Sequence, residues 1–506
     1  MRPAGLTRLL HPLWKVKPGA QTDGSPIVRP AAGADGAHTV GCAYRQNGVM
    51  LGERYMDRKS SGITRRTVLA GTGSGSVALA MAACGGPATP GGETKSAAPK
   101  EITILKSSST EQVDNGWRSA LEAASKATNV KATLVVETAA TTAPFWEKRQ
   151  NEFAAGSPSG DVTYNQNNWV LIGGLRGMFV DHLPYMTRDK VNQGEYIKIE
   201  LDSWKWKNKQ WGIPFQSGGE AVMINKQLFE EKGVPIPSAN WTYDDLVQIS
   251  QRLHYPGNNQ AGLEVGQNGI QYMAGTFMRN FGGKVLNDAR NKAVYADDPL
   301  STRGAEMNVD LHQKYKVTPT PAMTALVPSG SSLFRSRRAA ININYIGYIA
   351  AVADLGAGNV ELLPPPKGPT GVQSARVVGN AWSILTQSKN ADPSWLVLKW
   401  LHTKEGLLGS GSGQLLGMGW PPIVYAGEAP IWADRFKGTR IADVTKVWTT
   451  AGHNQVVLPE GDPALQEMNP PWTRALNGEV GVREGLRESQ DKVNVLFGKR
   501  PKDWEM

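Results

Sequence analysis

Residues 211–253, "WGIPFQSGGEAVMINKQLFEEKGVPIPSANWTYDDLVQISQRL", switch repeatedly between strand and helix patterns. "EAVMIN" has the alternating apolar residues of a strand, and "KQLFEEKG" has the pattern of a short helix that ends at Gly233. The prolines of "VPIPSANW" favour an extended connector, because a residue that precedes proline avoids the helical conformation. Thr242 is placed as the N-cap of a second helix, with Asp245 as its capping partner. This order of elements predicts an α/β fold.

The same alternation begins near Glu101, where the folded part of the chain is expected to start. "EITILKSSS", "KATLVVETA" and "SGDVTYNQ" have strand patterns, and helical spacing lies between them over residues 113–127 and 146–155. Strands that alternate with helices indicate βαβ units and a mostly parallel sheet.

Further segments follow in a fixed order. They are "MRNFGGKVLNDARNKAVYADDPLSTRGAEMNVDL", "LFRSRRAAININYIGYI", "VELLPPPKGP", "VVGNAWSILTQSKNADPSWLVLKWLHTKEG" and "GMGWPPI". Together with residues 211–253, they resemble the family 1 extracellular solute-binding proteins of bacterial ABC importers. The resemblance runs from about Glu101 to the carboxyl terminus. The chain departs from the family pattern at Asn380, which replaces a glycine, and at residues 346–348, which replace Gly-x-Trp.

The resemblance implies a two-lobed fold of the type II periplasmic-binding-protein kind, with the ligand held between the lobes. Each lobe is expected to be a mostly parallel sheet flanked by helices, and each is assembled from discontinuous segments. The expected amino-terminal lobe is residues 101–213 plus 376–438, and the expected carboxyl-terminal lobe is residues 214–370 plus 439–506. Hinge crossings are expected near residues 213–219, near residues 367–376 and close to Gly438.

An export signal precedes the folded part. Residues 64–86, "TRRTVLAGTGSGSVALAMAACGG", carry a basic start at Arg65 and Arg66, an uncharged middle and small residues before Cys84. The stretch resembles a twin-arginine signal joined to a lipobox, and the general secretory route is the alternative. We expect a signal peptide over residues 56–83, lipidation at Cys84 and a flexible tether over residues 84–100.

The leader lies unusually far from the first Met. Our hypothesis is that translation starts at Met56 or Met50, so that residues 1–55 are a gene-start artefact or a disordered extension. The formal charge of the whole chain is +10, but residues 1–83 hold 11 Lys and Arg against 4 Asp and Glu, which leaves about +3 for the exported part. The composition therefore gives no support for binding to nucleic acid.

A sugar site needs aromatic planes for stacking and short polar side chains for the hydroxyls. Trp204 and Trp206 alternate with lysines, which predicts a half-exposed hairpin, and Trp395 and Trp400 lie on an apolar helical face, which predicts core positions. The predicted ligand contacts lie after strands or at the crossings that the resemblance implies. They are Trp117, Asn167, Asn168, Trp169, Gln216, Ser217, Glu220, Tyr345, Tyr348, Asn380, Trp382 and Trp420.

The sequence offers little for catalysis. The seven His residues show no ligand spacing, and no cysteine remains after Cys84 to complete a metal site, so neither a metal nor a cofactor is expected. The carboxylate pairs Glu230-Glu231 and Asp244-Asp245 fit solvated helix faces. "GSGSG", residues 409–413, lacks the Lys-Ser/Thr of a P-loop. No catalytic residue is predicted.

These observations lead to one main functional hypothesis. The chain is expected to be a monomeric, non-enzymatic receptor, anchored by lipid to the outer face of the cytoplasmic membrane, that binds a small solute and delivers it to the transmembrane subunits of an ABC permease. A sugar or oligosaccharide is the expected solute. Two alternatives stay open: a lipid-anchored enzyme that degrades polysaccharide, and a receptor for a non-sugar, polyamine-like solute.

Overall fold

The structure is a computed structural model. It describes residues 100–109, 111–138, 142–266, 268–327, 332–345, 355–408, 422–424, 434, 436–454, 456 and 458–505. These residues all belong to one compact unit that spans residues 93–506. The leader and the predicted lipidation site lie outside the described residues.

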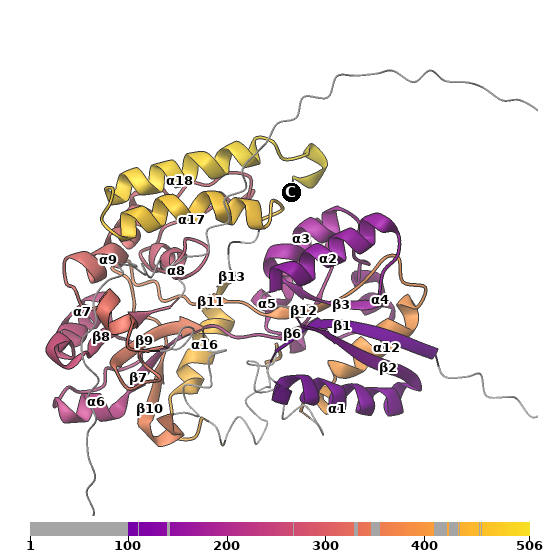
Figure 1. The fold of residues 1–506 in the computed structure, drawn as a ribbon, viewed down its shortest axis with the longest axis horizontal. Coiled ribbons are helices and arrows are strands. Elements are labelled where there is room, and N and C mark those ends of the chain that lie inside the picture. Colours follow the sequence, from indigo (N-terminus) through magenta and orange to yellow (C-terminus); the bar gives the residue numbers. More distant parts are fainter. Residues whose placement is uncertain are drawn as a thin grey trace, which may run out of the picture. The chain divides into compact units, whose positions relative to one another are not determined.

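Five strands form the first sheet, in the order β2-β1-β3-β12-β6 (Figure 1). The strands are β1 (Lys100–Ser107), β2 (Val130–Glu137), β3 (Val162–Gln166), β6 (Ile213–Gln216) and β12 (Asn380–Ile384). β1 pairs in parallel with β2 and β3, whereas β12 pairs antiparallel with β3 and β6.

Helices cover both faces of this sheet. Figure 1 shows α2 and α3 on one face and α1 and α12 on the other. The helices of this lobe are α1 (Glu111–Thr128), α2 (Thr142–Ala155), α3 (Asn167–Leu175), α4 (Leu183–Arg188), α5 (Lys198–Asp202), α12 (Ala391–Leu401) and α13 (Lys404–Leu408). As predicted, Trp395 is buried in the core of this lobe and Trp400 packs against it.

A two-stranded hairpin, β4 (Lys205–Trp206) and β5 (Lys209–Gln210), is present where the alternating Trp and Lys residues predict one. The prediction that it is half exposed is confirmed, because Trp204 and Trp206 are buried whereas Lys207 and Lys209 are exposed. Trp204 Nε1 donates a hydrogen bond to Glu200 Oε1 (3.1 Å), and Trp206 Nε1 donates to the carbonyl of Trp504 (3.0 Å). The hairpin is thus covered in part by the carboxyl-terminal segment, which local alternation cannot reveal.

Four strands form the second sheet, in the order β10-β7-β9-β8. They are β7 (Glu220–Asn225), β8 (Ala261–Val265), β9 (Ala339–Tyr345) and β10 (Val360–Leu363). β7 pairs antiparallel with β9 and β10, and β8 pairs in parallel with β9. Both sheets are therefore mixed, and the expectation of mostly parallel sheets is corrected. β1 and β2 are parallel because α1 carries the chain back between them, whereas β12 joins the first sheet from a distant segment and runs in the opposite direction to its neighbours.

The helices of the second lobe include the capped helix that the sequence predicts. In α7, the Thr242 side chain accepts from the Asp245 backbone, and Asp245 accepts from the Thr242 backbone, which confirms the capping box. The helices are α6 (Lys226–Glu231), α7 (Tyr243–Arg252), α8 (Met273–Asn280), α9 (Pro299–Gln313), α10 (Pro321–Thr324), α16 (Ile441–Ala451), α17 (Asp462–Leu476) and α18 (Val482–Phe497). Short 3₁₀ helices are η1 (Gln193–Glu195), η2 (Pro256–Asn258), η4 (Ala357–Asn359) and η6 (Lys502–Trp504).

The chain passes from the first sheet to the second between Gln216 and Glu220, and it returns before Asn380. On the return, β11 (Arg376–Val377) pairs in parallel with β13 (His453–Asn454), and Val377 also bridges to Gly219. The crossings therefore lie side by side. The exact lobe boundaries stay predictions.

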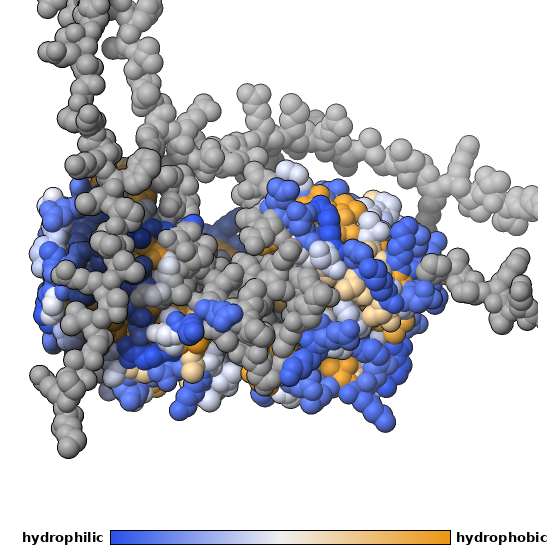
Figure 2. Space-filling model, turned by 90° about the horizontal axis from the view of Figure 1, so that it is seen from below, coloured by the Kyte–Doolittle hydropathy of each residue, from blue (hydrophilic) through white to orange (hydrophobic). Residues whose placement is uncertain are grey.

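The described surface in Figure 2 is mainly hydrophilic, with apolar residues in small groups. No described helix combines the length and the apolar character needed to cross a lipid bilayer.

Candidate functional site

A chain of hydrogen bonds connects the two sheets beside the crossings. Tyr164 Oη on β3 donates to Asn380 Oδ1 on β12 (2.9 Å), and Asn380 Nδ2 donates to Gln216 Oε1 on β6 (2.5 Å). Gln216 Nε2 then donates to Tyr345 Oη on β9 (3.5 Å), which itself donates to the carbonyl of Ser217 (3.4 Å). We call Tyr164, Gln216, Ser217, Tyr345 and Asn380 the hinge network.

Strand pairing brings these residues together. Asn380 lies opposite Gln166 on β3 and opposite Gln216 on β6, where the register shifts between Asn380 and Ala381. Tyr345 is the last residue of β9 and pairs with Glu220 at the start of β7. Burial raises the pKa of Tyr164 and of Tyr345, so both hydroxyls are neutral donors at physiological pH.

The buried carboxyl group of Glu200 contacts the crossing at Ser217. Glu200 on α5 accepts hydrogen bonds from Trp204 Nε1 (3.1 Å) and from Ser217 Oγ (3.3 Å). Its burial raises its pKa to about 8, although these two hydrogen bonds oppose the shift. A Cβ atom on Gly379 would lie 2.4 Å from Glu200 Oε1 and 1.8 Å from the carbonyl oxygen of Gln216, so a glycine is needed at this close approach.

A buried ion pair fixes the other side of the crossing. Glu220 at the start of β7 accepts from Arg376 Nε (2.8 Å) and from the Arg376 backbone N–H (3.1 Å). Thr276 Oγ1 on α8 also donates to Glu220 (2.5 Å). The Glu220 carboxylate is fully buried and these donors surround it, so the structure gives this predicted ligand contact a structural role.

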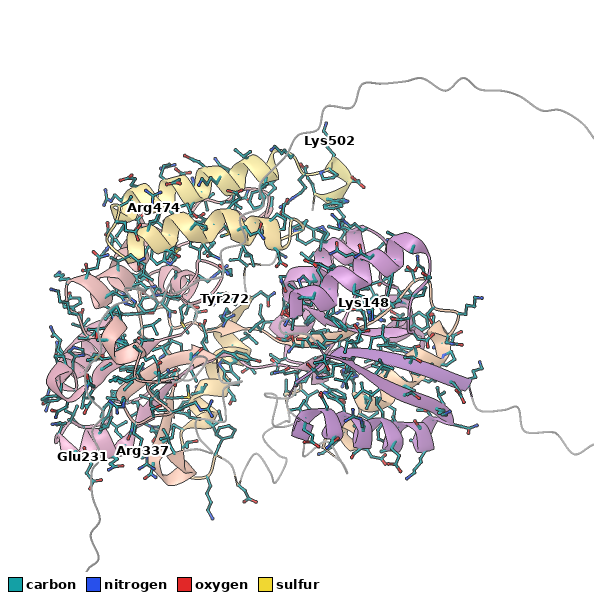
Figure 3. The ribbon with its side chains drawn as sticks, viewed as in Figure 1. Lys148, Glu231, Tyr272, Arg337, Arg474 and Lys502 are labelled. Carbon is teal, nitrogen blue, oxygen red and sulfur yellow. The ribbon has the colours of Figure 1, made fainter. Side chains whose placement is uncertain are left out.

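Tyr272 lies directly before α8, and its aromatic ring contacts Arg376 of the buried ion pair (Figure 3). The guanidinium carbon of Arg376 lies 4.9 Å from the centre of this ring. Tyr272 is only half buried, and it lies in a turn that follows no predicted strand. Sequence analysis missed Tyr272, and it also missed Tyr164, although the position of Tyr164 near the end of the third predicted strand could have indicated it.

Three predicted aromatic contacts lie inside the amino-terminal lobe. Trp117 and Trp382 are buried and pack edge to face at 4.9 Å, and Phe215 contacts both rings. Trp169 is buried and stacks on Trp146 at 5.4 Å. Their burial favours a packing role over ligand contact.

The two predicted asparagines on α3 contact other parts of the protein. Asn167 Nδ2 donates to Ser203 Oγ (3.0 Å), and Asn168 Nδ2 donates to Asp462 Oδ1 (2.6 Å). Trp169 Nε1 donates to the other oxygen of Asp462 (3.3 Å), at the start of α17. Asn168 and Trp169 therefore connect α3 to α17, whereas Asn167 connects α3 to the end of α5.

Some predicted functional residues cannot be placed. Tyr348, Trp420, Cys84, Arg65 and Arg66 lie outside the described residues. Of the twelve predicted contacts, the structure brings Gln216, Ser217, Tyr345 and Asn380 together.

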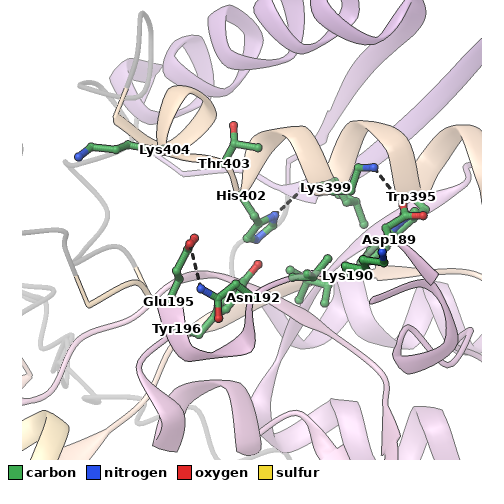
Figure 4. Close-up of a pocket in the computed structure, with 13 residues that line it drawn as sticks. Asp189, Lys190, Asn192, Glu195, Tyr196, Trp395, Lys399, His402, Thr403 and Lys404 are labelled. Atoms are coloured by element: carbon green, nitrogen blue, oxygen red, sulfur yellow. Dashed lines mark hydrogen bonds and ion pairs between the residues drawn. The ribbon is translucent and has the colours of Figure 1, made fainter. Parts of the chain in front are cut away.

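The described residues contain no group of three or more His, Cys, Asp or Glu side chains placed to hold a metal ion. A cavity of about 630 Å³ lies in the amino-terminal lobe between η1 and α12, lined in part by Asp189, Tyr196, Trp395, Lys399 and His402 (Figure 4). Trp395 Nε1 (2.8 Å) and Lys399 Nζ (3.0 Å) both donate to Asp189 there. None of the predicted ligand contacts lines this cavity, so we do not assign the ligand to it.

Comparison with curated proteins finds distant relatives. The chain is 23% identical over 308 residues to an erythritol/L-threitol-binding protein of Mycolicibacterium smegmatis, a match that covers 55% of this chain and 61% of the relative. It is 25% identical over 324 residues to a binding protein of Brucella abortus, with 56% of this chain and 75% of the relative covered. The chain thus spans about three fifths of the length of the first relative.

Solved structures share the fold. An ABC substrate-binding protein from Listeria monocytogenes in complex with cycloalternan has a TM-score of 0.65 at 17% identity, covering 79% of this chain and 99% of the other. An ABC transporter solute-binding protein from Thermotoga lettingae with bound α-D-tagatose has a TM-score of 0.64 at 18% identity, covering 79% and 100%. These similarities confirm the two-lobed α/β fold.

A family model also matches the chain. The model of the bacterial extracellular solute-binding proteins matches residues 107–407, which is more than half of the chain. This match includes every residue of the hinge network and every strand of the two sheets except β1, of which it reaches only the last residue. It shows that the chain belongs to the family of bacterial extracellular solute-binding proteins.

Proposed function

We propose that this protein is the substrate-binding lipoprotein of an ABC importer and that it binds a sugar or polyol between its lobes. The observation that carries the proposal is the hydrogen-bond chain from Tyr164 through Asn380 and Gln216 to Tyr345, because it places amide and hydroxyl groups of both sheets at one point. Amides and hydroxyls can each donate and accept, as a sugar hydroxyl requires.

The mechanism is a shift between open and closed forms. A solute that contacts both sheets makes its full set of contacts only when the lobes close, so its binding energy stabilises the closed form. The hinge network supplies donors and acceptors on both sides of the crossing, and the permease would recognise the closed form. No bond in the solute changes, and the protein acts as a monomer.

The relatives support a small polyhydroxylated ligand. The Mycolicibacterium smegmatis relative is named for erythritol and L-threitol, and structural neighbours hold tagatose and ribitol. A polyamine-like solute fits less well, because Arg279 and Arg376 lie near the crossing, where their charges add to the burial that lowers the pKa of His453. A polycation would meet repulsion there.

The proposal is tested by thermal unfolding of the full chain against a panel of sugars and polyols, including erythritol, ribitol and tagatose. A true ligand at one hundred times its dissociation constant stabilises the folded state by about 2.7 kcal/mol. Asn380→Ala should weaken this stabilisation, whereas Gln227→Ala, on the exposed face of α6, should not. Release of product from a glycan at catalytic ratios would instead support the alternative of a polysaccharide-degrading enzyme.

Export and anchoring form a separate part of the proposal. Family membership indicates an extracellular protein. We propose that Cys84 carries the lipid that ties it to the membrane, following the signal with Arg65 and Arg66. Cys84→Ser should move the protein from the membrane fraction to the soluble fraction of cells, and retention in the membrane would contradict the anchor.

A further inference from the structure

One face of α8 collects polar side chains next to the hinge network. Tyr272, Thr276 and Arg279 follow one another at spacings of four and three residues, so they lie on the same side of the helix. Thr276 Oγ1 bonds Glu220 and lies 3.3 Å from His453 Nε2, and the Tyr272 ring contacts the Arg376 guanidinium. This face therefore turns toward β11 and β13 at the crossing.

Arg279 differs from Arg149, Arg376 and Arg500, which are buried and paired with carboxylates. Arg376 pairs with Glu220 (2.8 Å), Arg149 with Glu137 (2.8 Å), and Arg500 with Glu460 through two hydrogen bonds (2.6 and 2.9 Å). Within the part of the chain that the structure describes, the Arg279 guanidinium forms no hydrogen bond and no ion pair. Its residue is neither fully buried nor exposed.

Arg279 lies close enough to His453 and Arg290 for its charge to affect their pKa values. Burial lowers the pKa of Arg279, and no neighbouring carboxylate opposes this shift. Burial, Arg279 and Arg376 together hold the pKa of His453 well below its usual value. The charge of Arg279 also contributes to the lowered pKa of Arg290, which burial and Arg500 lower further.

No described residue serves as a counterion for the Arg279 guanidinium. An anionic ligand would supply one. Taking a charged group out of water is unfavourable unless an opposite charge pairs with it, and lobe closure would remove more water from Arg279. The planar guanidinium matches the two oxygens of a carboxylate or a phosphate, and such paired hydrogen bonds are stronger than those to a neutral hydroxyl.

We propose that Arg279 binds an anionic group of the transported solute, so that the ligand is a polyhydroxylated acid or a sugar phosphate. This inference rests on the proposed function and narrows its ligand class. The hinge network would bind the hydroxyl groups, and Arg279 would bind the carboxylate or phosphate from the α8 side. Tyr272, on the same side of α8 as Arg279, would contribute its aromatic ring to contacts with the carbon skeleton.

The test compares matched acid and neutral ligands on the full chain by isothermal titration calorimetry. The pairs are gluconate with sorbitol, galacturonate with galactose, and glucose 6-phosphate with glucose; the first two report on a carboxylate and the third on a phosphate. In the unmodified protein, at least one acid should bind about tenfold more tightly than its neutral partner. In Arg279→Gln that ratio should fall to about one, and Arg279→Lys should keep part of it.

Two controls separate binding from folding. Arg303→Gln removes one positive charge from the exposed face of α9 and should leave the acid-to-neutral ratio unchanged. Ligand-free Arg279→Gln should be at least as stable as the unmodified protein, because the substitution removes a charge that no described residue pairs. A clear loss of stability in Arg279→Gln would assign Arg279 a structural role and overturn the inference.

The other possible binding results distinguish failure of the anionic inference from failure of the proposed function. If neutral sugars or polyols bind and the acids bind no better, the anionic inference is overturned while the proposed function stands. The same holds if Arg279→Gln keeps the preference for the acid. If no acid, sugar or polyol binds, the proposed function fails, and the inference fails with it.

Discussion

The Glu220 carboxylate and the Arg376 guanidinium form an ion pair at 2.8 Å, and neither side chain exposes more than 3% of its surface. Glu220 begins β7 where the chain enters the second sheet, and Arg376 begins β11 where the chain returns toward the first. The ion pair therefore connects the outgoing crossing at Glu220 to the returning crossing at Arg376 in the protein interior. Buried pairs of this kind contribute little when formed, but the loss of one partner leaves an uncompensated charge.

Glu220→Gln is expected to destabilise the protein by about 3–5 kcal/mol, because Arg376 is left charged and buried. Urea unfolding measures this change. The control is Arg483→Gln, which breaks the exposed pair of Arg483 with Glu306 and should cost no more than about 1 kcal/mol. Equal effects of the two substitutions would show that the crossing does not depend on the buried pair.

Glu200 is expected to make stability depend on pH. Its folded pKa is raised to about 8, above the ordinary value of 4.5, so the folded state holds the proton more tightly than the unfolded state. The resulting stabilisation is complete below about pH 4.5 and is lost as the pH rises to about 8. The free energy of unfolding should therefore fall with pH across this window in the unmodified protein relative to Glu200→Gln. Parallel pH profiles for the two proteins would refute the prediction.

Gly219 is expected to tolerate no side chain. A Cβ atom there would lie 2.0 Å from Trp448 Nε1, whose N–H donates to the carbonyl of Glu220 (2.9 Å). Gly219→Ala should push α16 away from the crossing and cost about 1–3 kcal/mol in thermal or urea unfolding. Gly257→Ala is the matched control, because no atom lies within 4 Å of its new Cβ, and it should change stability by less than about 0.5 kcal/mol. A neutral Gly219→Ala would contradict the close packing.

Trp169 is expected to act through packing on Trp146. Trp169→Ala removes a buried indole and should destabilise the protein by about 3–5 kcal/mol. Trp169→Phe keeps an aromatic ring against Trp146 but loses the hydrogen bond to Asp462, so it should retain most of the stability and bind ligand nearly as well as the unmodified protein. A large loss of affinity with little loss of stability in Trp169→Phe would instead support the sequence-based prediction that Trp169 contacts the ligand. Calorimetric titration with a ligand from the panel distinguishes the two results.

The sequence by itself determined the local elements and the family. Alternation placed β1, β2, β3 and β7, and the Thr242 capping box placed the start of α7, because these signals depend on neighbours only a few residues away. The resemblance of several ordered segments identified the two-lobed fold. It also placed Gln216 and Ser217 at the first crossing and Asn380 on the strand that enters the amino-terminal lobe, and the structure brings these residues together with Tyr345.

Only the tertiary structure decided which side chains are available to a solute. Trp117, Trp169 and Trp382 follow strands or lie on them as ligand contacts would, yet residues distant in the sequence bury them. Glu220 looks like a polar contact in the sequence, and only the return of the chain at Arg376 makes it an internal ion pair. Arg279 carries no sequence signal, because its lack of a counterion among the described residues is a property of its surroundings in space. Burial and pairing depend on contacts between distant segments, and no local pattern encodes them.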